Sequence, residues 1–116
     1  MSPTPGWPTP HWPEGVPHTI SGYEKPIFAF LDESAREFPD RVYTVFSGAD
    51  RTFAQVKDTA DRIANFLNSR GLGRGDRVAV LMANASEFLE IFFACAKTGA
   101  IMTPLNVRLA VPELVY

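Results

Sequence analysis

The sequence predicts an α/β fold organised around a strand–helix–strand (βαβ) unit in its C-terminal half. Two short apolar runs, at 76–82 and 100–105, have the length of buried strands, and the apolar segment 87–98 between them has the length of a helix. Strands joined by a helix over about 30 residues are typically parallel, with a right-handed crossover. A preceding amphipathic segment, 52–70, predicts a further helix, so we expect helices layered on a parallel sheet.

Length and composition are those of one small globular domain. The chain has 116 residues, of which 46% are hydrophobic and 21% charged. Its net charge of −2 gives no reason to expect nucleic acid or an anionic membrane as a partner. The apolar run Ile91–Ala96 is far shorter than the roughly 18 residues of a membrane-spanning helix, so no transmembrane segment is expected. The start shows no secretory signal and the single cysteine, Cys95, allows no internal disulfide, which favours a cytoplasmic location.

Residues 1–22 differ in composition from the rest of the chain. They hold six of the ten prolines, both tryptophans and both histidines. Proline removes backbone donors and blocks helix formation. Two interpretations stay open: an extended leader that lies over a surface with Trp7 and Trp12 as anchors, or a disordered tail. We therefore divide the chain into a Pro/Trp-rich leader, 1–22, and a folded portion, 23–116.

The folded portion is expected to begin with a helix from Pro26 to about Phe38. Pro26 suits the start of a helix, and Pro39 stops it. The segment 42–48 is rich in β-branched and aromatic residues and predicts a strand, and residues 48–51 are expected to form a turn. The apolar stripe of the helix carries Ile27, Leu31, Ala35 and Phe38.

The clearest helix is expected to start after Thr52. The sequence Thr-Phe-Ala-Gln has the spacing of a capping box, in which the Thr52 hydroxyl accepts from the amide of Gln55 and the Gln55 side chain accepts from the amide of Thr52. Gly71 is expected to supply a left-handed C-cap, with Leu72 as the apolar residue that often follows it. The face expected to be buried carries Phe53, Val56, Ala60, Ile63 and Leu67.

The βαβ unit comes next in the chain. Its first strand is nearly continuous in apolar residues, which is typical of a strand covered on both faces. Asn84 or Ser86 can cap the helix that follows, and this helix is expected to end at Gly99. Another helix is expected to start near Pro112.

The helix 87–98 is apolar over most of its circumference, and only Glu87, Glu90 and Lys97 interrupt the apolar surface. One sheet face covers one stripe of a helix, whereas two stripes need cover here. A two-stranded parallel sheet also leaves open edges. We therefore expect this chain to be part of a larger layered α/β protein. The two stripes carry Phe88, Ile91, Phe92 and Cys95, and Leu89, Phe92, Phe93 and Ala96.

Few residues form a pattern that suggests chemistry. Gly71–Asp76 is rich in glycine, but it follows a helix and precedes a strand, the reverse of a dinucleotide-binding loop, so a helix C-cap and a turn are expected. His11 and His18 have no further ligands at the spacing of a metal site. Cys95 lies in mid-helix among aromatic residues and is expected in the core.

Charged side chains give no stronger signal. Glu87 and Glu90 lie three positions apart on one helix and are expected to form a solvated edge. None of the lysines, Lys25, Lys57 and Lys97, lies in a loop rich in Gly, Ser or Thr. We assign no catalytic, cofactor-binding or metal-ligating residue in this chain.

Two segments resemble the adenylate-forming enzymes. The sequence RTFAQV, from position 51, is similar to the first core motif of that family, usually Thr-Tyr-x-Glu-Leu, with Phe53 in place of Tyr, Gln55 of Glu and Val56 of Leu. Residues 71–106 resemble the block that follows, including its Gly-Asp-Arg-Val-Ala, Lys-x-Gly-Ala and Pro-Leu-Asn steps. The resemblance covers 26–116, and the leader is similar to that of long- and medium-chain acyl-CoA synthetases.

The resemblance implies the N-terminal part of the large domain of an adenylate-forming enzyme. In that family a carboxylate, here expected to be a fatty acid, reacts with ATP and Mg²⁺ to give an acyl-adenylate, and coenzyme A then displaces AMP. The pyrophosphate loop and the catalytic lysine lie downstream of Asn106, so no active-site residue of the family maps onto this chain. The chain alone is expected to bind no ATP, Mg²⁺ or coenzyme A and to be inactive, and its partner is the rest of its own polypeptide.

Two rival interpretations stay open. One is a free-standing, non-catalytic binding module, which needs its own way to cover the helix 87–98, such as a homodimer. The other is the adenylation domain of a peptide synthetase. The leader argues against that assignment, and so does Asn106, where that group usually has Asp.

Overall fold

The computed structural model describes residues 15–16, 21 and 24–115. The predictions for the leader, including the anchor role of Trp7 and Trp12 and the absence of a metal role for His11 and His18, lie outside the described residues. Within them, helices and strands alternate over two small sheets, so the predicted α/β class is confirmed.

Helix α1 (Ile27–Glu37) follows Pro26 and ends before Pro39, close to the predicted bounds. Leu31 and Ala35 are buried, as the apolar stripe predicts. The two ends of that stripe, Ile27 and Phe38, stay partly exposed.

A β-hairpin follows α1, and here the prediction of a turn at 48–51 is wrong. Strand β1 (Val42–Phe46) pairs antiparallel with strand β2 (Ala49–Thr52). The turn is the two residues between them, Ser47 and Gly48, whose φ angles are 48° and 79°. Two successive positive φ values are the mark of the tight hairpin turn whose twist matches that of the strands. The residues of β2, Ala-Asp-Arg-Thr, have little strand propensity, so the pairing with β1 decides their conformation.

Helix α2 (Phe53–Ser69) has the predicted capping box and the predicted C-cap. The amide of Gln55 donates to the Thr52 hydroxyl at 3.3 Å, and the amide of Thr52 donates to Gln55 Oε1 at 2.9 Å. Gly71 is left-handed, and the amide of Leu72 donates to the carbonyl of Leu67 at 3.0 Å. These bonds satisfy backbone groups that the helix ends leave without partners. The buried residues are Val56, Ala60, Ala64 and Leu67.

The βαβ unit is confirmed. Strands β3 (Arg77–Leu81) and β4 (Ile101–Leu105) are parallel and in register along their full length, and helix α3 (Ser86–Thr98) connects them. Gly99 ends α3 in the left-handed conformation, as predicted. A short helix, α4 (Val111–Val115), follows β4.

Two expectations for this unit fail. The residue before α3 is Ala85, whose methyl group cannot accept a hydrogen bond, and neither Asn84 nor Ser86 caps the helix. Ser86 lies inside the first turn, and its hydroxyl contacts that of Thr44 on β1 at 3.3 Å. Strand β3 is also not covered on both faces: only Val80 is buried. Two strands and one helix cannot enclose a sheet, so the second face stays open in this chain.

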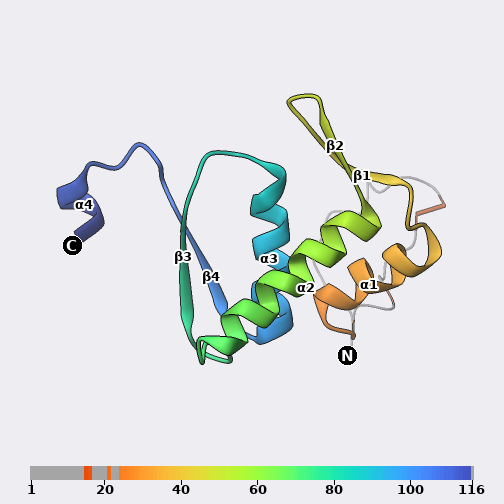
Figure 1. The fold of residues 1–116 in the computed structure, drawn as a ribbon, viewed down its shortest axis with the longest axis horizontal. Coiled ribbons are helices and arrows are strands. Elements are labelled where there is room, and N and C mark those ends of the chain that lie inside the picture. Colours follow the sequence, from red (N-terminus) through yellow and green to blue (C-terminus); the bar gives the residue numbers. More distant parts are fainter. Residues whose placement is uncertain (1–14, 17–20, 22–23, 116) are drawn as a thin grey trace.

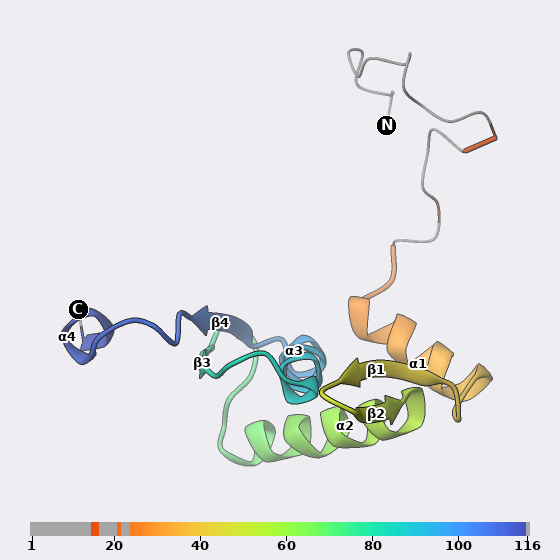
Figure 2. The ribbon, with the colours of Figure 1, turned by 90° about the horizontal axis from the view of Figure 1, so that it is seen from above.

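The core lies between helices, with α3 in the middle. Figures 1 and 2 show α3 between the β3–β4 sheet on one side and α1 with the hairpin on the other, while α2 crosses it at a steep angle. Small side chains at the contact between α2 and α3 let these helices approach closely. One core cluster joins α2, α3 and the start of β4, and the other joins α1, α2 and α3. Their buried members are Ala64, Leu67, Ala94, Cys95 and Ala100, and Leu31, Val56, Ala60 and Phe93.

Candidate functional site

The glycine-rich segment 71–76 is a turn in which several backbone amides already donate hydrogen bonds to nearby groups. The amide of Gly73 donates to Asp76 Oδ2 at 2.8 Å, and the amide of Asp76 donates back to the carbonyl of Gly73 at 3.1 Å. The amide of Gly75 reaches the carbonyl of Gly99, which ties the turn to the end of α3. The predicted C-cap and turn are confirmed, and these amides are not arranged to hold a phosphate.

Cys95 is in the core, as predicted. Its side chain is buried in the cluster between α2 and α3, and burial raises the pKa of its thiol. Nucleophilic cysteines need the opposite, a lowered pKa and access to solvent. Cys95 therefore acts as a small packing residue.

Glu87 and Glu90 do not form a solvated edge together, and this prediction is wrong for Glu90. Glu87 is exposed, whereas Glu90 is 1% exposed and lies where α3 meets the hairpin. Arg51 of β2 lies between them, with Nη2 3.6 Å from Glu87 Oε1 and Nε 3.9 Å from Glu90 Oε1. In the described part of the chain, neither carboxylate oxygen of Glu90 has a hydrogen-bond partner.

The surroundings of Glu90 favour its neutral form. Burial raises the pKa of its carboxyl, the nearby Arg51 opposes that effect, and the charge of Glu87 adds to it. Helical periodicity places Glu90 beside Glu87, but only the docking of the hairpin onto α3 buries it. No pattern within α3 could have indicated that burial.

The sequence also gave no sign of an ion network that joins three helices. Lys97 of α3 is 13% exposed, and its Nζ donates to Asp32 of α1 at 2.6 Å and to Asp61 of α2. Lys57 Nζ lies 2.5 Å from Asp61 Oδ2 and 3.9 Å from Asp32 Oδ1. Burial opposes both charges, but the hydrogen bonds outweigh it, so the pKa of Lys97 is raised and that of Asp61 is lowered.

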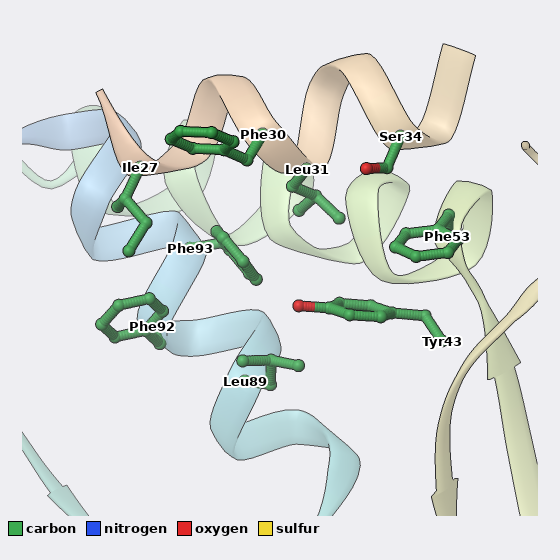
Figure 3. Close-up of a pocket in the computed structure, with 9 residues that line it drawn as sticks. All are labelled: Ile27, Phe30, Leu31, Ser34, Tyr43, Phe53, Leu89, Phe92 and Phe93. Carbon is green, nitrogen blue, oxygen red and sulfur yellow. The ribbon is translucent and has the colours of Figure 1, made fainter. Parts of the chain in front are cut away.

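An apolar groove lies between α1, α3 and the hairpin, and we call it the aromatic groove (Figure 3). Its volume is about 550 Å³. Tyr43 and Phe53 stack on one wall with ring centroids 4.3 Å apart, and Phe92 meets Phe93 edge to face at 5.3 Å. The polar side chains in the described lining are Ser34 and Tyr43. The groove is lined by Ile27, Phe30, Leu31, Ser34, Tyr43, Phe53, Leu89, Phe92 and Phe93.

Other kinds of site can be assessed within the same residues. Across 15–16, 21 and 24–115, no group of three or more His, Cys, Asp or Glu side chains is placed to hold a metal ion. Among the helices that the structure describes, none has the length and apolar character needed to cross a membrane. The chemical features that remain are the aromatic groove, the buried Glu90 and the ion network.

Comparison with known proteins connects this fold to a family. The family model described as "AMP-binding enzyme" matches residues 31–116. The long-chain-fatty-acid–CoA ligase FadD13 of Mycobacterium tuberculosis is 46% identical over 65 residues, which are 56% of this chain and 13% of the relative. The chain thus spans a small part of the length of the curated relatives it matches.

Solved structures agree with that match. A candidate long-chain-fatty-acid CoA ligase from Rhodopseudomonas palustris superimposes with a TM-score of 0.73 at 35% identity, over 79% of this chain and 23% of the other. The N-terminal subdomain of Klebsiella oxytoca NpsA gives a TM-score of 0.71 at 27% identity, over 78% of this chain and 24% of the other. The chain therefore belongs to the AMP-binding enzyme family, and its fold is that of a part of the N-terminal subdomain of these adenylate-forming enzymes.

Proposed function

We propose that the complete protein is an ATP-dependent acyl-CoA ligase, which converts a fatty acid to its acyl-adenylate and then to its coenzyme A thioester. The observation that carries this proposal is the family match over 31–116. The 46% identity to FadD13, a long-chain-fatty-acid–CoA ligase, supports the substrate class. ATP, Mg²⁺ and coenzyme A belong to that complete enzyme.

The role proposed for these 116 residues is structural. They do not fit a triphosphate, because the Gly73 amide is taken by Asp76 and the lysines are held by carboxylates. They supply one flank of the N-terminal domain, and the open face of the β3–β4 sheet is where the rest of the polypeptide would pack. A hollow of about 370 Å³ between α3 and β4, lined in part by Phe88, Met102 and Pro104, adds to that face.

A second candidate is the adenylation domain of a peptide synthetase, in which a carrier protein accepts the acyl group. It is supported by the structural match to NpsA, which has also been solved as an artificially fused adenylation–PCP di-domain with ThdA. Both candidates share the first half-reaction, adenylation of a carboxylate. They differ in the thiol that accepts the acyl group.

Pyrophosphate exchange in the complete protein tests the shared step. We expect label from pyrophosphate to enter ATP only when a carboxylic acid is added, with fatty acids better than amino or benzoic acids. Exchange without any acid, or no exchange with any acid, would rule out the ligase assignment. Replacing coenzyme A with a carrier protein in the second half-reaction then separates the two candidates.

We also propose that the protein works in the cytoplasm. Cys95, the single cysteine of this chain, is a free thiol buried in the core, where it needs no oxidising compartment. Fractionation of the source cells, with detection of the chain by an antibody, tests this. Recovery in a secreted fraction would contradict it.

A further inference from the structure

The carboxyl group of Glu90 lies where the β1–β2 hairpin packs on α3. Its side chain is 1% exposed, and within the described residues neither of its oxygens has a hydrogen-bond partner. One turn earlier on α3, the buried hydroxyl of Ser86 contacts that of Thr44 on β1 at 3.3 Å. An ionised carboxylate at such a place is unfavourable until it gains a partner or meets water.

The charged groups that face Glu90 do not stabilise its ionised form. From β2, Arg51 Nε lies 3.9 Å from Glu90 Oε1, which is beyond hydrogen-bonding distance. The same guanidinium also lies 3.6 Å from Glu87, so one partly exposed cation is shared by two carboxylates. Glu87, on the preceding turn of α3, adds a like charge.

The other elements around α3 add no further charge to this place. On β1 the titratable group is the phenol of Tyr43, whose pKa burial raises above its ordinary value of 10.0, so it stays neutral at neutral pH. The charged side chains of α1 and α2 near α3 belong to the ion network around Lys97, and they are Asp32, Lys57 and Asp61.

The hairpin above Glu90 is held mainly at its base. There the amide of Phe53, at the start of α2, donates to the carbonyl of Arg41 at 3.0 Å. Beyond the base, the turn of the hairpin lies past the ends of α2 and α3 (Figure 1). A two-stranded hairpin is only marginally stable without packing, and local opening begins in such elements. Its largely exposed apolar side chains include Val42, Val45 and Phe46.

We propose that the proton on Glu90 controls whether the hairpin stays docked on α3. While the carboxyl group is neutral the hairpin is docked, and when the proton is lost the hairpin turns away about its base and admits water to the carboxylate. Opening of the hairpin leaves the buried cluster of α1, α2 and α3 intact, so it requires less free energy than unfolding of the whole chain. Tyr43 moves with the hairpin, and the aromatic groove loses one wall.

The pH range follows from the two states of the carboxyl group. In the docked state burial raises the pKa of Glu90, whereas in the open state the group returns to its ordinary value of 4.5. Docking is therefore complete below pH 4.5 and weakens as the pH rises to the raised value. Because a single proton is released, the docking equilibrium falls by at most about tenfold per pH unit in that range.

Hydrogen exchange with mass spectrometry on the 116-residue chain tests this, because the hairpin and the helices give separate peptides. The protection factors of amides in 42–52 should fall above pH 4.5 and should be smaller than those of α2 at every pH. Glu90→Gln cannot ionise, so its hairpin should keep its protection over the same range. Arg51→Met removes the cation that opposes the raised pKa, so the fall should extend to higher pH.

Asp58→Asn is the matched control, since Asp58 is an exposed acid on α2, and it should leave the fall unchanged. Circular dichroism should show equal helix content in all variants. Hairpin protection that does not depend on pH in the wild type overturns the proposal, and so does an equal fall in Glu90→Gln. Equal protection of hairpin and α2 amides at each pH would also overturn it, because the chain would then open only as a whole.

Discussion

The burial of Glu90 lowers the stability of the folded state when its carboxyl group is ionised. A carboxylate that is buried with no hydrogen-bond partner is unfavourable by several kcal/mol unless it is protonated or paired. Arg51 is the nearest cation, at 3.9 Å, which is too far for a hydrogen bond. The result is a carboxyl whose pKa is raised above its ordinary value of 4.5. Its ionisation therefore works against folding.

The sign of the resulting pH dependence can be tested with Glu90→Gln. Below pH 4.5 the wild-type carboxyl is protonated in both the folded and the unfolded state, so the variant should melt with the wild type. As the pH rises through the raised folded pKa, the wild type should lose stability that the variant keeps. The difference in melting temperature between them should therefore grow toward neutral pH. Glu87→Gln, at an exposed position, should show no such trend, and a constant difference at all pH values would contradict this account.

Thr52 contributes through two hydrogen bonds at the start of α2. Thr52→Ala removes the side-chain acceptor and should lower the free energy of unfolding by about 1 kcal/mol, as measured by urea denaturation. Thr52→Ser retains the acceptor and should cost much less. In the complete enzyme, the Michaelis constant for ATP should be unchanged by Thr52→Ala. A large change in that constant at equal stability would show that Thr52 contacts substrate.

At the scale of elements, the three helices are joined by both packing and charge. Lys97 connects α3 to Asp32 of α1 and Asp61 of α2, which are 65 and 36 positions away in the chain. This network lies at the edge of the core rather than in open solvent. It is therefore screened less than an ordinary surface pair.

Lys97→Met tests the network. Loss of two charge-assisted hydrogen bonds should lower the free energy of unfolding by about 1.5–3 kcal/mol at neutral pH. The raised pKa of Lys97 means that its contribution is complete below pH 10.5 and is lost as the pH rises through the raised value. The lowered pKa of Asp61 means that its contribution is complete above pH 3.8 and is lost as the pH falls. As the pH moves to either the acidic or the alkaline extreme, the variant should accordingly lose less stability than the wild type.

Arg62→Met provides the control for that experiment. Arg62 and Asp58 form an i,i+4 pair on α2 at 3.9 Å, but both side chains are exposed. Such pairs contribute about 0.3–0.5 kcal/mol. An equal loss in Arg62→Met and Lys97→Met would show that the network adds nothing beyond surface charge.

Helix α3 is central to the packing, and a charge in its core should prevent folding. Phe93 is 5% exposed and contacts the buried residues of α1 and α2. Phe93→Asp buries an unpaired carboxylate and creates a cavity, each of which costs several kcal/mol. We expect no soluble, cooperatively melting protein. Phe66→Asp, at an exposed position on α2, should fold normally, and normal melting of Phe93→Asp would show that α3 is less buried than the structure indicates.

At the scale of the whole molecule, two apolar surfaces are left open beside α3. One is the face of the two-stranded β3–β4 sheet, where Leu81 and Ile101 are half-exposed. The other is the aromatic groove. The first matches the expectation that a helix apolar on two stripes belongs to a larger layered protein. The chain spans 13–24% of the relatives and structures described above, which agrees with this.

The partners of the Gly73 amide and of the lysines predict how the chain behaves toward nucleotide. The isolated 116 residues should show no specific heat of binding with Mg-ATP in calorimetry, since the Gly73 amide and the three lysines already have partners. The complete protein, measured under the same conditions, should bind it. Micromolar affinity in the isolated chain would mean that these residues contain a nucleotide site.

The sequence by itself determined the features whose hydrogen bonds join residues close together in the chain. The capping box at Thr52, the left-handed glycines at 71 and 99, and the turn at 71–76 depend on hydrogen bonds between near neighbours, so local pattern was sufficient. The βαβ unit was also predictable, because the periodicity of apolar residues reflects which faces are buried. The family resemblance was carried by these same segments.

Only the tertiary structure decided the rest. Strand β2 exists because β1 pairs with it, Glu90 is buried because the hairpin docks on α3, and Lys97 is paired because three helices meet. The aromatic groove likewise needs side chains from α1, the hairpin and α3 at once. Each of these depends on contacts between segments that are far apart in the chain, and a local pattern contains no information about the partner that supplies the burial or the charge.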